Sequence, residues 1–151
     1  MYSESEQLII DNAMNIIREK MISYKRDQVF NSPADVRLYL NMRLHALERE
    51  VFLCLFLDTQ HRLIADEILF TGTIDASSVY PREVVKRALE LNAAAVIFSH
   101  NHPSGVPEPS MADERITLRL RDALALVDVR VLDHVIVGGD VNISMAEKGL
   151  L

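Results

Sequence analysis

Apolar residues recur along the chain at two spacings, which separate predicted helices from predicted strands. A spacing of three to four residues indicates one face of a helix, and a short unbroken apolar run indicates a buried strand. The first spacing predicts helices over about residues 4–22, from Ser32-Pro33 through Leu47, from a cap at Ser78 to Asn92, and over 111–126. Strands are expected over 51–57, 62–71, 93–98, 130–137 and 141–144.

The order of these elements predicts an α/β domain. Residues 51–57 are apolar at every position, so this strand should be buried on both faces and lie at the centre of the sheet. Strand 62–71 should form an antiparallel hairpin with it, and Gly138-Gly139-Asp140 should turn a second hairpin. We therefore expect a mixed central sheet with helices packed on both sides.

The N-terminal helix is set apart from the rest of the chain by a linker at residues 24–31. We accordingly divide the chain into residues 1–31, a helix and linker, and residues 32–151, the main domain. The broad apolar stripe of the helix needs a partner. We expect it to pack on its own domain; the alternative is a second subunit, which would make the protein a homodimer.

Length and composition narrow the class of protein. A chain of 151 residues can bury a core without disulfides, and its one cysteine, Cys54, lies in an apolar run where an inert thiol is expected. The N-terminus lacks the features of a signal peptide, and no apolar stretch approaches the roughly 18 residues of a membrane span. We expect a cytoplasmic protein without membrane contact. A net charge of -6 argues against a general phosphate-binding surface.

Candidate chemistry gathers at residues 100–113. His100 and His102 follow a predicted strand at positions i and i+2, so their imidazoles should project to the same side. Ser110-x-x-Asp113 precedes a helical pattern, which places the carboxylate in the first turn of that helix. Two imidazoles and one carboxylate would leave a fourth tetrahedral position open, the arrangement of a catalytic zinc site with one Zn²⁺ per chain.

Each part of this motif has a simpler interpretation. An isolated His-x-His is more often a pair of loop histidines than a metal site, and Ser-x-x-Asp alone is more often only a helix cap. The two occur here together, joined by a segment stiffened by Pro103, Pro107 and Pro109. The combination favours the metal site.

The pattern His-x-His, seven residues, Ser, two residues, Asp resembles the signature of the JAMM (JAB/MPN) metalloproteases. The block His100–Gly105, with 81–89 and 126–134, is similar to the RadC subfamily from about residue 32 to 151. The resemblance implies a layered fold like that of cytidine deaminases. It also implies a zinc-dependent hydrolase, a metallopeptidase or isopeptidase with a peptide or protein substrate. The chain looks like the short form, without the helix-hairpin-helix module of longer members.

Hydrolysis also needs a general base and a group that stabilises the oxyanion. Two carboxylates are candidates for the base, namely Glu50, just before the strand 51–57, and Glu67, within the strand 62–71. The resemblance implies Glu50. It likewise implies that Ser110 donates a hydrogen bond to the oxyanion. We expect His134 to lie in the core or behind a metal ligand rather than to bind the ion itself.

Two other functions stay open from the sequence. Because RadC-like proteins carry a DNA-repair label, the chain could be a nucleic-acid-associated module, although its acidity weighs against direct DNA binding. It could also be a non-catalytic MPN scaffold, against which the full set of site residues argues. A nucleobase deaminase is disfavoured, because that signature requires a Pro-Cys-x-x-Cys pair and Cys54 stands alone.

Overall fold

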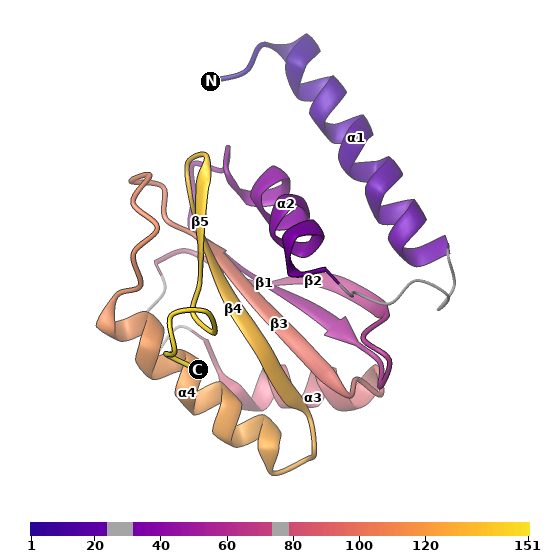
Figure 1. Ribbon diagram of the computed structural model, residues 1–151, viewed down its shortest axis with the longest axis vertical. Coiled ribbons are helices and arrows are strands. Elements are labelled where there is room, and N and C mark those ends of the chain that lie inside the picture. The colour runs from indigo at the N-terminus through magenta and orange to yellow at the C-terminus, as the bar shows by residue number, and fades with distance from the viewer. Residues whose placement is uncertain (24–31, 74–78) are drawn as a thin grey trace.

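The computed structural model describes residues 1–23, 32–73 and 79–151, the side chains of 21–23 excepted. The described part forms four helices and one five-stranded sheet (Figure 1). The elements in chain order are α1 (Glu4–Ser23), α2 (Pro33–Leu44), β1 (Val51–Leu57), β2 (Leu63–Thr71), α3 (Pro81–Glu90), β3 (Ala95–Asn101), α4 (Met111–Ala125), β4 (Arg130–Gly138) and β5 (Val141–Ser144).

The strands lie in the order β2-β1-β3-β4-β5. Only β3 and β4 are parallel; the other neighbouring pairs are antiparallel, so the sheet is mixed as predicted. The predicted hairpins β1–β2 and β4–β5 are confirmed. The prediction that β1 lies at the centre is wrong, because β3 does. Both strands are buried along their whole length, so apolar content alone cannot tell one from the other.

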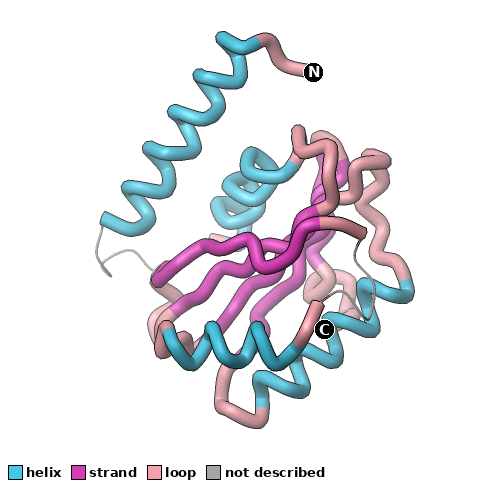
Figure 2. The backbone as a smooth tube through the Cα atoms, turned by 180° about the vertical axis from the view of Figure 1, so that it is seen from behind, coloured by secondary structure: helices cyan, strands magenta, loops and turns pink. Residues whose placement is uncertain are grey.

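Helices cover both faces of the sheet, as expected for the α/β class (Figures 1 and 2). Successive side chains of β1 point to opposite faces of the sheet and therefore pack against different helices. Phe52, Cys54 and Phe56 belong to a core cluster with residues of α3 and α4, whereas Leu53, Leu55 and Leu57 belong to a cluster with residues of α2. Burial raises the pKa of the Cys54 thiol well above its usual value, which agrees with an inert residue.

Two predicted helix ends differ from the structure. α2 ends at Leu44, and Leu47, expected on its apolar face, lies beyond it with 36% of its surface exposed. The carbonyl of Leu47 instead accepts a hydrogen bond from the Asn101 side chain, a partner distant in sequence. α3 begins at Pro81, where proline is preorganised for the first helical turn. Ser78, predicted as its cap, lies outside the described residues.

The third strand is longer than its apolar run suggested. It was expected to end at Phe98, but β3 continues to Asn101 and includes His100. The extension is held on both sides, since His100 is the partner of Phe52 in β1 and of Ile136 in β4. Its residues Ser99, His100 and Asn101 are polar yet buried, so an apolar pattern does not reveal this end of the strand.

The N-terminal helix contacts its own domain through its second half. Ile17 packs against the core cluster beneath α2, and Arg18 donates from Nε to the Tyr39 hydroxyl at 3.4 Å. Arg18 also lies 3.4 Å from the Asp66 carboxylate of β2. Leu8 and Ile9, in the first half, are about 70% exposed. In the described part of the chain, no helix combines the length and the apolar character needed to span a membrane.

Candidate metal centre

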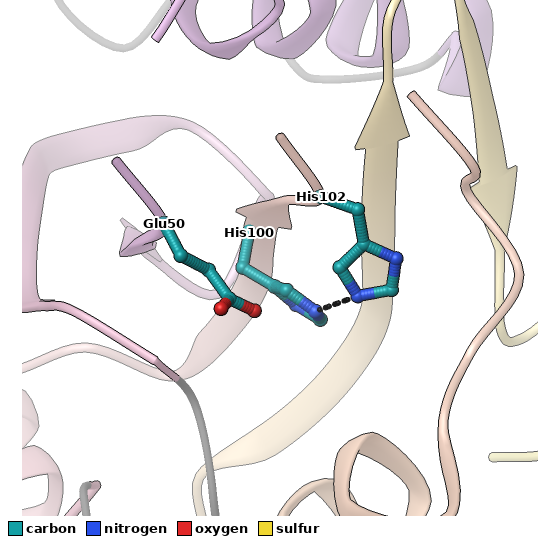
Figure 3. A group of neighbouring side chains, drawn as sticks. All are labelled: Glu50, His100 and His102. Carbon is teal, nitrogen blue, oxygen red and sulfur yellow. Dashed lines mark hydrogen bonds between the residues drawn. The ribbon is translucent and has the colours of Figure 1, made fainter. Parts of the chain in front are cut away.

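The predicted histidines lie where the end of β3 meets the start of β1 and the N-terminus of α4. The antiparallel register pairs Phe52 with His100, and continuing it by two residues sets Glu50 level with His102. One ligand atom from each of Glu50, His100 and His102 lies within 4.8 Å of the others. Figure 3 shows these three side chains pointing toward one another, from the end of β3, from the residue that follows it and from the segment before β1.

The two imidazoles face each other closely. Nε2 of His100 lies 3.0 Å from Nε2 of His102, as the spacing of i and i+2 predicted (Figure 3). The His100 side chain is fully buried, and that of His102 is 17% exposed. The pair therefore has one protected member and one that borders solvent.

Asp113 completes this arrangement from the first turn of α4. Its Oδ1 lies 3.1 Å from Nε2 of His100, and its Oδ2 lies 3.1 Å from Nε2 of His102. The predicted capping box is present: Ser110 Oγ accepts from the Asp113 N–H at 3.1 Å, and Asp113 Oδ2 accepts from the Ser110 N–H at 2.8 Å. The cap fixes a carboxylate that is only 1% exposed.

The local electrostatics favour an ionised Asp113. Burial alone would raise the pKa of this carboxyl group, but hydrogen bonds to His100 and His102 outweigh it and hold the pKa well below its usual range. The same contact with Asp113 raises the pKa of His102, against the opposing effect of burial. The site thus holds a buried negative charge beside two imidazole nitrogens.

These atoms fit a tetrahedral metal ion. Zinc bonds of about 2.0–2.1 Å place neighbouring ligand atoms roughly 3.3–3.4 Å apart. Here the two Nε2 atoms are 3.0 Å apart, and each lies 3.1 Å from a different oxygen of the Asp113 carboxylate, Oδ1 for His100 and Oδ2 for His102. The donor set is two nitrogens and one anionic oxygen, a common set for catalytic zinc. The residues present therefore suit the ion that the sequence predicted.

The loop after β3 sets the orientation of His102. Nδ1 of His102 lies 2.8 Å from the Val106 carbonyl oxygen. A carbonyl oxygen only accepts hydrogen bonds, so Nδ1 carries a proton, and in the neutral ring Nε2 presents a lone pair to the site. The backbone of this loop approaches Gly138 of β4 so closely that a Cβ there would lie 2.6 Å from Pro107 N.

His134 lies in the core directly behind His100, in agreement with the prediction that it would be a core histidine or lie behind a metal ligand. Its Nε2 is 2.7 Å from Nδ1 of His100, and its Nδ1 is 2.5 Å from Oγ1 of Thr117 in α4. Burial is the main cause that lowers the pKa of His134 well below its usual value. Thr117 was not singled out from the sequence, because a threonine inside a helix carries no motif.

Asn101 is a second residue that sequence reasoning missed. Its Oδ1 accepts from the Val51 N–H at 2.8 Å, and its Nδ2 donates to the carbonyls of Leu47 and Arg49 at 3.2 and 2.8 Å. These bonds fasten the backbone on both sides of Glu50. The Glu50 carboxylate lies beside His100 and His102.

The other two predicted residues have clear positions. Ser110 is exposed at the N-terminus of α4, next to Asp113. Glu67, the alternative base, is bound in β2 by the Arg87 guanidinium, with Nε and Nη2 contacts of 2.5–3.0 Å. It pairs in the sheet with Cys54 and lies outside the group formed by Glu50 and the histidines. The structure brings Glu50 to the site and not Glu67.

Comparison with known proteins places these observations in a family. The model of the family described as RadC-like JAB domain matches residues 30–150. A UPF0758 protein of Pseudoalteromonas translucida is 55% identical over 145 residues, 96% of this chain and 63% of the relative. One from Nitrosococcus oceani is 63% identical over 127 residues, 84% of this chain and 57% of the relative.

A UPF0758 protein of Vibrio cholerae has nearly the same extent, with 55% identity over 146 residues, 97% of this chain and 90% of the relative. The chain spans 62–63% of the length of the first relatives it matches. The family match extends over almost all of residues 32–151, including every residue of the candidate site. The chain belongs to the RadC-like JAB domain family.

Proposed function

We propose that this protein is a zinc-dependent hydrolase of the JAMM type that cleaves amide bonds in a peptide or protein. One observation carries the proposal. Nε2 of His100 lies 3.0 Å from Nε2 of His102, and each of these atoms lies 3.1 Å from one oxygen of the Asp113 carboxylate. A carboxylate oxygen of Glu50 lies within 4.8 Å of a ring nitrogen of each histidine. His100, His102 and Asp113 would hold one Zn²⁺. When bound there, the ion would lower the pKa of a water molecule toward about 7 and polarise the substrate carbonyl.

Glu50 is assigned the role of general base. Its carboxylate receives the proton of the attacking water and passes it to the nitrogen of the leaving group. The C–N bond then breaks, giving a carboxylic acid and an amine. Asn101 supports this role because it holds the backbone of both neighbours, Arg49 and Val51, and so limits where the Glu50 side chain can reach.

Ser110 is assigned the role of stabilising the oxyanion. Its Oγ accepts from the Asp113 N–H, and among the described residues its own hydroxyl proton has no acceptor. That proton can be donated to the oxygen on which negative charge develops during attack. The exposed position of Ser110 leaves room for a substrate on this side of the site.

The proposal is tested by separating metal binding from turnover. Zinc should bind the purified protein at one ion per chain, and Asp113→Asn should weaken that binding, because a neutral amide poorly replaces an anionic ligand. Glu50→Gln should keep the zinc and lower amide hydrolysis about 10²–10⁴-fold. The matched control is Glu67→Gln, a carboxylate held by Arg87 away from the site, which should change neither quantity.

The substrate can be sought with the same variant. Glu50→Gln should retain the binding surface and stop turnover, so a peptide or protein substrate should stay associated with it. A wild-type protein that takes up no divalent ion would contradict the proposal. Salt-dependent retention on DNA that does not require zinc would also contradict the proposal, and it would favour the nucleic-acid-associated module instead.

A further inference from the structure

We propose that Thr117 and His134 form a buried chain of hydrogen bonds that fixes the tautomer of His100, and that they are positioning residues for the metal. The inference rests on the proposed metal site. It concerns a residue of α4 and a residue of β4 that neither touch the ion position nor belong to the signature motif. The chain runs from the Asp113 carbonyl through Thr117 and His134 to His100.

The direction of this chain follows from the single proton of the Thr117 hydroxyl. Oγ1 lies 2.6 Å from the backbone carbonyl oxygen of Asp113, which can only accept. Without the hydroxyl proton between them, two oxygen lone pairs would face each other at that separation. The Met145 sulfur, at 3.7 Å, is a weaker acceptor. Thr117 therefore donates to the carbonyl and must accept from Nδ1 of His134.

The direction of this bond determines which nitrogen of each imidazole carries the proton. His134 is fully buried against Phe52 and Phe98, and its two ring nitrogens contact Thr117 and His100, so a single ring proton serves both contacts. With that proton on Nδ1, Nε2 of His134 is bare and can only accept. Nδ1 of His100, 2.7 Å away, must be the donor. Nε2 of His100 is left with a lone pair, which is the atom that faces His102 and Asp113. The reverse arrangement would put a proton on that atom and block it as a ligand.

The residues around this chain shield its hydrogen bonds from water. Thr117, His100 and His134 are each fully buried. Phe52 and Phe98 make T-shaped ring contacts with His134, with centroids 5.5 and 6.0 Å away, and Phe52 stacks on His100. An apolar wall of this kind offers no alternative acceptor for the Nδ1 proton of His134. Removal of the threonine hydroxyl should thus be felt at His100, two hydrogen bonds away.

The test compares three variants in one helix. Thr117→Val removes the hydroxyl at nearly constant shape, and Thr117→Ser restores it. Ile116→Val is the matched control, since Ile116 is also fully buried in α4 but belongs to the apolar cluster. Zinc affinity by chelator competition should fall about 10–100-fold in Thr117→Val, the usual effect of losing a partner behind a metal ligand. It should stay within about threefold of wild type in the other two variants.

The second readout is the tautomer itself, from long-range ¹H–¹⁵N correlation of the histidine rings. His134 should carry its proton on Nδ1 in the wild type, in Thr117→Ser and in Ile116→Val, with zinc or with chelator. A proton on Nε2 of wild-type His134, or full zinc affinity in Thr117→Val, would overturn the inference. If wild-type protein binds no zinc, the proposed function fails and with it the role of the two residues toward the metal, whereas the His134 tautomer still decides whether Thr117 sets the order of the hydrogen bonds.

Discussion

Gly138→Ala should loosen the metal site from a distance, through the backbone of the loop that holds His102. Gly138 lies at the end of β4, and a Cβ added there would meet Pro107 N at 2.6 Å and the carbonyl carbon and oxygen of Gly105 at 2.9 Å. All three atoms are backbone, so no side chain can turn away. To reach an ordinary contact of 3.4 Å, the loop must move by roughly 0.5–0.8 Å.

That displacement has two measurable consequences. Overpacking of this kind costs about 1–3 kcal/mol of stability. At about 2–4 °C per kcal/mol for a chain of this size, Tm should fall by roughly 2–12 °C. The moving loop also carries the Val106 carbonyl, which lies 2.8 Å from Nδ1 of His102. Loss of that contact should weaken zinc binding about 10–100-fold.

The neighbouring glycine supplies the control. Gly139 has a positive φ of 58°, and a Cβ there would find no atom within 4 Å. Gly139→Ala should therefore cost backbone strain of about 1 kcal/mol while zinc affinity stays unchanged. Thermal unfolding in chelator and zinc titration separate the two effects. If Gly138→Ala binds zinc as the wild type does, the loop does not orient His102 and the reasoning fails.

Three further predictions follow from contacts of the described residues. Asn101→Leu removes three buried hydrogen bonds and should lower the free energy of unfolding in urea by about 1.5–4.5 kcal/mol; an unchanged midpoint would contradict the role of Asn101. In chelator, Tm should decrease as pH rises above about 6.5, because contact with Asp113 raises the pKa of His102 and the stabilising charged form is lost; His102→Gln should flatten this slope. A chain starting at Lys25 should fold and bind zinc with unchanged affinity, since the residues that Arg18 and Tyr2 contact, namely Tyr39, Asp66 and His45, do not belong to the candidate site; insolubility of the shortened chain would show that α1 protects the core.

Most of the fold could be predicted because helices and strands have different periods. The apolar run of β1 predicted a strand buried on both faces, and its alternate side chains do enter two core clusters. Sheet order could not be predicted in the same way. Whether β1 or β3 lies in the middle depends on which edges pair, and this is decided by contacts between residues far apart in the sequence.

In the candidate site, too, local geometry could be predicted from the sequence and long-range contacts could not. The geometry of His100 with His102, and that of Ser110 with Asp113, follows from local rules for strands and helix caps, and both appear as predicted. The supporting residues are joined across 50 residues for Asn101 and Val51, and across 34 for His134 and His100. A spacing of that size leaves no periodic pattern, so these contacts can be read only from the folded chain.

Register between β1 and β3 connects the core of the domain to its chemistry. Side chains alternate along a strand, so a slip of one residue would turn Glu50 away from His102 and bring another residue level with it. Phe52 opposes such a slip, because its ring packs against Phe98 at 5.2 Å and stacks on His100. The aromatic contact that fills the core therefore also sets the distance between the carboxylate and the imidazoles. For this reason we expect substitutions of Phe52 to impair the site as well as the stability of the fold.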